Sequence, residues 1–148
     1  MVILAIFLIS GPAIAGDLSL TQPHPSLSPQ DVVTIVMRAL KNNNVPTPDR
    51  GIEITFNFAS PANKQMTGPL TRFIPMVKGP VYGNMIGYRS FSLENKRRRG
   101  DIAVIDAILT LQSSAFAGFR FQLSLQKNNQ FYGSWMTDAV FPIKVDAL

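Results

Sequence analysis

The sequence predicts an α+β fold in which N-terminal helices pack on one face of a curved, four-stranded antiparallel sheet. Three observations lead to this prediction. Apolar residues recur at spacings of three and four between residues 29 and 42, which indicates an amphipathic helix. In the second half of the chain the period changes to two, which is typical of strands with one buried face. Helical segments come first and strands follow, as in an α+β domain.

The composition fits one domain with a single hydrophobic core. The chain has 148 residues, of which 46% are hydrophobic and 16% are charged, and it contains no cysteine. A domain of this length buries enough surface to fold without disulfides or metal. The lack of cysteine excludes a disulfide scaffold, an iron–sulfur cluster, a thiolate zinc site and a cysteine nucleophile. His24 is the only histidine, which leaves no His-rich metal site. We expect neither a metal nor a cofactor.

Residues 1–15 resemble a signal peptide. No polar side chain occurs from Val2 to Ile9, and residues 13–15 read Ala-Ile-Ala, which fits an A-x-A cleavage site. No Lys or Arg precedes the apolar run, and the alternative is a buried first helix or strand of the domain. We expect an exported protein of a bacterial periplasm or a plastid (thylakoid) lumen, with secretion as the alternative, because an exported chain without cysteine suits those compartments best.

Residues 16–27 are rich in Pro, Ser and Thr, and we interpret them as a linker or an extended arm. A helix is expected next, from about Pro29 to Asn42, because Ser28 suits an N-cap and Asp31 lies at the positive end of the helix dipole. Proline at the first helical position supports the same start. The apolar face of this helix would consist of Val32, Ile35, Val36, Ala39 and Leu40.

Residues 51–60 have an ambiguous pattern. Apolar side chains at every second position from Ile52 to Phe58 favour a strand, but the same segment also fits a helical stripe, and periodicity alone does not decide between them. The helical period returns from Thr67, where Pro75 is expected to shorten or kink the helix. A further turn is expected over residues 80–86.

Four segments of the second half predict the strands of the sheet. Residues 102–112 carry a wholly apolar face, and apolar residues alternate with polar ones over residues 119–126. Residues 127–130 supply a turn, after which residues 131–140 would form the returning strand. The segment 88–93 is the expected first strand.

The local sequence resembles a known family. The motif F-x-F-A-S-P-A-N at residues 56–63, followed by T-G-P-x-x-x-F at residues 67–73, looks like an uncharacterised family (domain of unknown function 4864) of the SnoaL-like, nuclear transport factor two-like superfamily. Residues 133–137 are similar to the closing strand of that family. The resemblance covers residues 28–142, which would be followed by a C-terminal tail at residues 143–148.

The resemblance implies a cone-shaped roll with a cavity between the concave sheet face and the helices, and it favours a helix for residues 51–60. Proteins of this fold use the cavity for small apolar ligands, for isomerase or hydrolase chemistry without a cofactor, or they form dimers. A fold does not by itself determine a function. Our expectation for this chain is a non-catalytic module that binds a small apolar ligand or forms a homodimer. The candidate binding residues are Asn57, Ser60, Asn63, Tyr82 and Trp135.

Two of these residues also have simpler interpretations. Ser60 before a proline is typical of a helix terminus or turn. Trp135 is typical of a core position, because aromatic side chains contribute much of the burial energy of a small domain.

An isomerase or hydrolase is the alternative function. Such a site needs a carboxylate base in an apolar cavity, with a tyrosine that stabilises an oxyanion. Asp106 and Asp138 are the mid-strand carboxylates, and Tyr132 shares its strand parity with Asp138. The alternation of its strand places Asp106 opposite Ile105 and Leu109, where it would point to solvent or to a basic side chain.

A basic run contributes most of the net charge of +5. It consists of Lys96, Arg97, Arg98 and Arg99. The polar neighbours and Gly100 predict that this run is a solvated hairpin loop. The functional alternative is an anchor for an anionic membrane surface. Nucleic-acid binding is not expected, because basic residues interleaved with exposed aromatics are not found elsewhere in the sequence.

Overall fold

The computed structural model describes residues 16–146, so the predicted signal peptide lies outside the described residues. The helices are α1 (Pro29–Lys41), α2 (Arg50–Asn57), α3 (Pro61–Thr67) and α4 (Leu70–Lys78), followed by the short 3-10 turn η1 (Gly83–Met85). The strands are β1 (Ser90–Arg99), β2 (Ile102–Thr110), β3 (Phe116–Leu125) and β4 (Trp135–Ile143). Helices precede strands throughout, and the predicted α+β class is confirmed.

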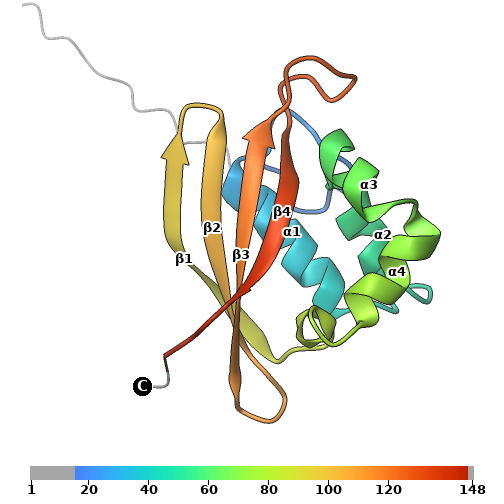
Figure 1. Ribbon diagram of the computed structural model, residues 1–148, viewed down its shortest axis with the longest axis vertical. Coiled ribbons are helices and arrows are strands. Elements are labelled where there is room, and N and C mark those ends of the chain that lie inside the picture. Colours follow the sequence, from blue (N-terminus) through green and yellow to red (C-terminus); the bar gives the residue numbers. More distant parts are fainter. Residues whose placement is uncertain (1–15, 147–148) are drawn as a thin grey trace, which may run out of the picture.

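The strands form one antiparallel meander in the order β1-β2-β3-β4. Figure 1 shows α1 lying across one face of this sheet, with α2, α3 and α4 gathered on the side of β4. The residues of β2 that point to the helices are all buried: Ala103, Ile105, Ala107 and Leu109. We call this side the helical face and the opposite side the open face. The core of the domain therefore lies between the helical face and α1.

Helix α1 begins with the cap that the sequence predicts. The Ser28 hydroxyl accepts a hydrogen bond from the main-chain nitrogen of Asp31 at 3.1 Å, and the Asp31 carboxylate accepts one from the nitrogen of Ser28 at 2.9 Å. This reciprocal pair satisfies main-chain donors that a helix start leaves free. The helix buries Val32, Val33, Ile35, Val36, Met37 and Leu40.

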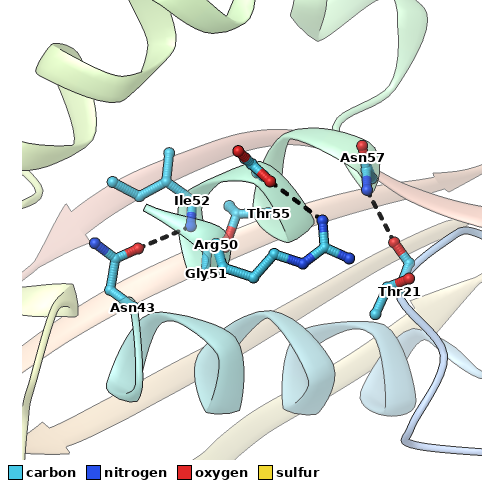
Figure 2. Close-up of polar contacts among 8 residues, drawn as sticks. Thr21, Asn43, Arg50, Gly51, Ile52, Thr55 and Asn57 are labelled. Carbon is cyan, nitrogen blue, oxygen red and sulfur yellow. Dashed lines mark hydrogen bonds and ion pairs between the residues drawn. The ribbon is translucent and has the colours of Figure 1, made fainter. Parts of the chain in front are cut away.

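Residues 50–57 form helix α2, as the family resemblance implies. Figure 2 shows how the end of α1 holds this helix: the Asn43 side chain accepts a hydrogen bond from the nitrogen of Ile52 at 2.9 Å. The main-chain oxygen of Asn43 also accepts one from Gly51 at 2.9 Å. A Cβ atom at Gly51 would lie 2.1 Å from the carbonyl oxygen of Ala39, so only glycine permits this close approach of α2 to α1.

Helix α4 contains the proline that the sequence places in its interior. Pro75 lies within the nine-residue helix, which ends soon afterwards at Lys78. Its buried side chains are Phe73 and Val77, which face the core. The prediction of a short helix in this segment is confirmed. The physical reason is that proline removes one main-chain donor from the helix.

Strand β1 corrects the prediction for the basic run. The strand extends to Arg99, so residues 96–99 lie in a strand and the expected hairpin loop is wrong. Arg97, Arg98 and Arg99 pair with β2 after a register shift between Glu94 and Arg97, where Asn95 has a φ of 48°. β1 is an edge strand, and edge strands accept charged side chains because these discourage pairing with another chain.

Strand β4 begins later than the sequence predicts. It starts at Trp135 and not at residue 131, because residues 127–133 form a wider loop than the expected turn. The nitrogen of Gly133 donates to the oxygen of Gln126 at 2.8 Å, and Gly133 itself has a φ of 80°. This left-handed conformation favours glycine and breaks the strand alternation before Ser134.

Residues 16–27 contain no helix or strand but lie on the domain. Leu27 is buried, and Leu18 and Leu20 are partly buried against the core. At the other end β4 includes Ile143, after which residues 144–146 have no regular structure. Within residues 16–146 we find no helix with the length and apolar character required to cross a membrane.

Candidate functional site

A cavity of about 100 Å³ lies between the helices and the helical face of the sheet. Its buried floor is apolar and comes from separate elements: Val36 and Leu40 of α1, Phe73 and Val77 of α4, and Phe121 of β3. None of the lining residues is charged. Because burial of an unpaired charge is costly, this floor is suited to a neutral, apolar group.

The open side of the cavity is formed by half-buried residues. Thr55 of α2, Asn63 and Thr67 of α3, Met76 of α4 and Tyr82 before η1 line this rim. The rim therefore provides most of the polar groups of the site, whereas the floor provides apolar surface. Such a division is typical of pockets that bind small molecules.

Three hydroxyl groups of the cavity wall already donate hydrogen bonds to the main chain. Thr55 donates to the oxygen of Gly51 at 2.9 Å. Thr67 donates to the oxygen of Asn63 at 3.1 Å. Tyr82 donates to the oxygen of Val140 at 3.1 Å, and in doing so fixes the rim to β4. The hydrogens of these three hydroxyls are therefore not available to a ligand.

Thr137 of β4 is the polar residue of the cavity that differs from the others. Its side chain is buried, and its hydroxyl oxygen has no hydrogen-bond partner in the part of the chain that the structure describes. Its main chain is fully engaged: the nitrogen donates to Phe58 at 2.8 Å, and the oxygen accepts from the nitrogen of Ser60 at 2.8 Å. The Asn63 side chain donates to the same oxygen at 3.0 Å. Thr137 is thus firmly held while its hydroxyl is unpaired.

A bulge in β4 explains which of its residues line the cavity. Thr137 pairs with Leu123 and Ala139 pairs with Gln122, so Asp138 is an extra residue without a partner on β3. The strand alternation restarts after this residue. As a result Thr137 and Val140 both line the cavity, although they are an odd number of positions apart.

The structure places the five candidate binding residues differently. Asn63 and Tyr82 line the cavity. Asn57 donates a hydrogen bond to the main-chain oxygen of Thr21 at 3.0 Å, which ties α2 to the N-terminal segment (Figure 2). The Ser60 hydroxyl accepts from the nitrogen of Asn63 at 3.2 Å and caps α3.

Trp135 is not among the residues that line the cavity. It is 5% exposed and belongs to the core cluster. The Arg98 guanidinium lies over its ring, 4.8 Å from the centroid. This contact engages one arginine of the basic run, although all four of its residues are solvent-exposed.

Asp106 lies on the open face of the sheet, away from the cavity. It is fully buried there. The Nε and Nη2 atoms of Arg120 donate hydrogen bonds to its two carboxylate oxygens at 2.8 and 2.9 Å. Asn95 donates a further hydrogen bond at 3.0 Å. The hydrogen bond from Arg120, opposed by desolvation, lowers the pKa of Asp106 below its usual value. Asp106 is therefore an ionised partner of Arg120 in a groove of the open face.

The other two residues of the isomerase alternative also lie outside the cavity. Tyr132 is 72% exposed in the loop before β4. Asp138 occupies the bulge and is partly exposed. The structure does not bring Tyr132, Asp138 and Asp106 together at the cavity. Among residues 16–146 no group of three or more His, Cys, Asp or Glu side chains is placed to hold a metal ion.

Sequence reasoning missed Thr137, Thr55 and Thr67. One signal was available for Thr137, because it shares strand parity with the core residue Trp135, and a polar residue on a core-facing parity needs a partner. The two other threonines carry no comparable signal. Thr55 lies in the segment whose helical or strand state the pattern leaves open, and Thr67 ends α3, a helix that the sequence analysis does not predict.

No protein-family model matches the chain, and comparisons with curated proteins and with solved structures give no significant match.

Proposed function

We propose that the chain has the SnoaL-like cone fold and that it binds a small, uncharged and largely apolar molecule in the cavity between the helices and the sheet. The observation that carries this proposal is the character of the cavity: an apolar floor from α1, α4 and β3, with no charged side chain in its lining. Burial of apolar surface would provide most of the binding free energy.

The volume of the cavity limits the size of the ligand. An engineered protein cavity of about 150 Å³ accommodates benzene. The present cavity, at about 100 Å³, therefore has room for roughly four non-hydrogen atoms. A longer molecule would insert one end and extend across the half-buried rim near Met76 and Tyr82.

The proposal includes membership of the domain of unknown function 4864. The motif at residues 56–63 supports it, because this segment contributes part of the cavity wall. Ala59 and Asn63 line the cavity, and Ala59 forms a parallel bridge with Thr137. If the members of the family share a binding role, their common motif is expected to form part of the cavity wall.

A titration with a small hydrocarbon tests the proposed function. We expect 2-methylbut-1-ene to cause saturable shifts in the methyl NMR signals of Val77 and Met85, which line the cavity. Val140→Phe should abolish these shifts, because the larger ring fills the cavity from its half-buried edge. Val104→Phe is the matched control, since Val104 is a half-buried valine in β2 on the open face. Absence of saturable shifts at the lining methyl groups, both with this hydrocarbon and with its ketone analogue butan-2-one, would overturn the proposal.

A further inference from the structure

We propose that the hydroxyl of Thr137 is the recognition group of the cavity, and that it donates a hydrogen bond to the carbonyl-type oxygen of a neutral ligand. This inference rests on the proposed function, because it names the chemical class that the same cavity selects. Short ketones, aldehydes and esters belong to this class. Hydrocarbons of equal shape lack the acceptor oxygen.

The first argument is the state of the Thr137 hydroxyl. Thr137 is 5% exposed, and its hydroxyl oxygen is buried without a hydrogen-bond partner among the described residues. Buried polar groups in folded proteins nearly always have a partner, and those without one require an explanation. Because Thr137 lines the cavity, a molecule inside the cavity can supply that partner.

The second argument is an accounting of the hydroxyl hydrogens around the cavity. Thr55, Thr67 and Tyr82 each donate to a main-chain oxygen. Among the described lining residues, the hydroxyl hydrogen of Thr137 is therefore the one without an acceptor. The complement of a free donor is an acceptor, and a carbonyl oxygen offers one without bringing a donor of its own.

The third argument concerns charge. No lining residue is charged, and the amine of Lys64, next to the lining residue Asn63, lies over the Phe56 ring at 4.9 Å from its centroid. It also lies 5.5 Å from the centroid of Phe131. A carboxylate in the cavity would consequently have no cation among the lining residues. A neutral acceptor avoids this desolvation cost.

The hydroxyl is also positioned before a ligand arrives. Thr137 bonds through its nitrogen to Phe58 and through its oxygen to Ser60, so its main chain is fixed on both sides. A donor held in this way loses little conformational freedom on binding, which favours specificity for an oxygen at one place in the cavity.

The test compares two probes of the same shape on the full chain. Butan-2-one and 2-methylbut-1-ene differ only in carrying C=O or C=CH₂ at the same carbon. Thr137→Val removes the hydroxyl with little change of shape and keeps the main-chain hydrogen bonds. We expect this variant to bind butan-2-one about three- to tenfold more weakly and to bind the alkene unchanged. Thr137→Ser, which keeps the hydroxyl, should retain the wild-type affinity ratio of ketone to alkene.

The outcomes separate this inference from the proposed function. If both probes bind the wild type and Thr137→Val weakens neither, or weakens both equally, the inference is overturned while ligand binding stands. If neither probe binds, both proposals are overturned. Should Thr137→Val fail to fold, the carbonyl ¹³C signal of labelled butan-2-one bound to the wild type decides. The free ketone is already hydrogen-bonded to water, so a bound signal close to its position in water supports a hydrogen bond in the cavity, whereas an upfield shift to its position in a hydrocarbon solvent refutes it.

Discussion

The side-chain amide of Asn63 donates a hydrogen bond of 3.0 Å to the main-chain oxygen of Thr137, although the two residues are 74 positions apart in the sequence. The nitrogen of Ser60 donates to the same oxygen at 2.8 Å. Both donors lie at the start of α3, so they attach this helix to β4 beside the unpaired hydroxyl. The wall of the cavity is therefore held by specific hydrogen bonds as well as by apolar packing.

Replacement of Asn63 tests this attachment. Asn63→Ala removes one of the two donors to the Thr137 oxygen, and we expect the free energy of unfolding to fall by about 0.5–1.5 kcal/mol, the usual contribution of one hydrogen bond. Urea unfolding followed by circular dichroism measures the change. Asn128→Ala in the exposed loop before β4 serves as the control and should change stability by less than about 0.5 kcal/mol. Equal losses in the two variants would contradict the assigned role.

Gly51 provides a test of the contact between α1 and α2. Gly51→Ala places a Cβ atom 2.1 Å from the carbonyl oxygen of Ala39, so the two helices must separate. We expect a loss of about 1–3 kcal/mol in the free energy of unfolding, as for other overpacked sites. At Gly83 a Cβ atom would meet its nearest neighbour at 3.4 Å, and Gly83→Ala is the matched control. A stable Gly51→Ala variant would show that the contact between the helices is looser than described.

The ion pair between Asp106 and Arg120 predicts a dependence of stability on pH. The pKa of Asp106 is lower in the folded state, chiefly through its hydrogen bond from Arg120. Its contribution is therefore fully present above the unfolded pKa of about 3.9, and it is lost as the pH falls through the lower, folded pKa.

Urea unfolding at about pH 5 and about pH 3 measures this dependence. Asp106→Asn removes the carboxylate, so the variant should be less stable than the wild type near neutral pH and should lose less stability on acidification. Asp146→Asn, in the exposed segment after β4, should follow the wild type. If Asp106→Asn loses as much stability on acidification as the wild type, the assigned pKa shift is wrong.

The stacking of Arg98 on Trp135 can be followed directly, because Trp135 is the only tryptophan of the chain. Arg98→Ala uncovers one side of the indole, so we expect a red shift of the fluorescence maximum and a loss of about 0.5–1 kcal/mol in stability. Arg99→Ala, one position further along β1, should leave the emission spectrum unchanged. Identical spectra for the two variants would argue against the stacking.

The sequence was sufficient for those elements that local patterns determine. The cap formed by Ser28 and Asp31 marks the start of α1, and the alternating pattern around Phe121 identifies β3. Helix α2 could not be derived from periodicity, because both periods fit the same residues. Its state depends on contacts made elsewhere in the chain, above all those of Asn43 and Gly51 with α1 and the following turn.

The candidate site was harder to predict than the fold. Asn63 and Tyr82 were found through the family resemblance, but the cavity also depends on the phase of β4, which the bulge at Asp138 changes. A bulge leaves no reliable mark in the hydrophobic pattern. The hydrogen bonds that surround Thr137 connect segments distant in the sequence, so the unpaired state of its hydroxyl became visible only in three dimensions.

The bulge in β4 also bears on how this strand tolerates changes in length. Because Asp138 is the extra residue, a chain that lacked it would still direct Thr137 and Val140 inwards, and the ladder with β3 would become regular. Deletion of Ala139 would have the same result, whereas one inserted residue would place Thr137 and Val140 four positions apart, which keeps both on the same face of the strand but shifts the residues that follow by two positions relative to β3. The strand can therefore lose one residue at this point and keep its pairing with β3, whereas a gain of one residue would preserve the facing of its side chains only by changing that pairing.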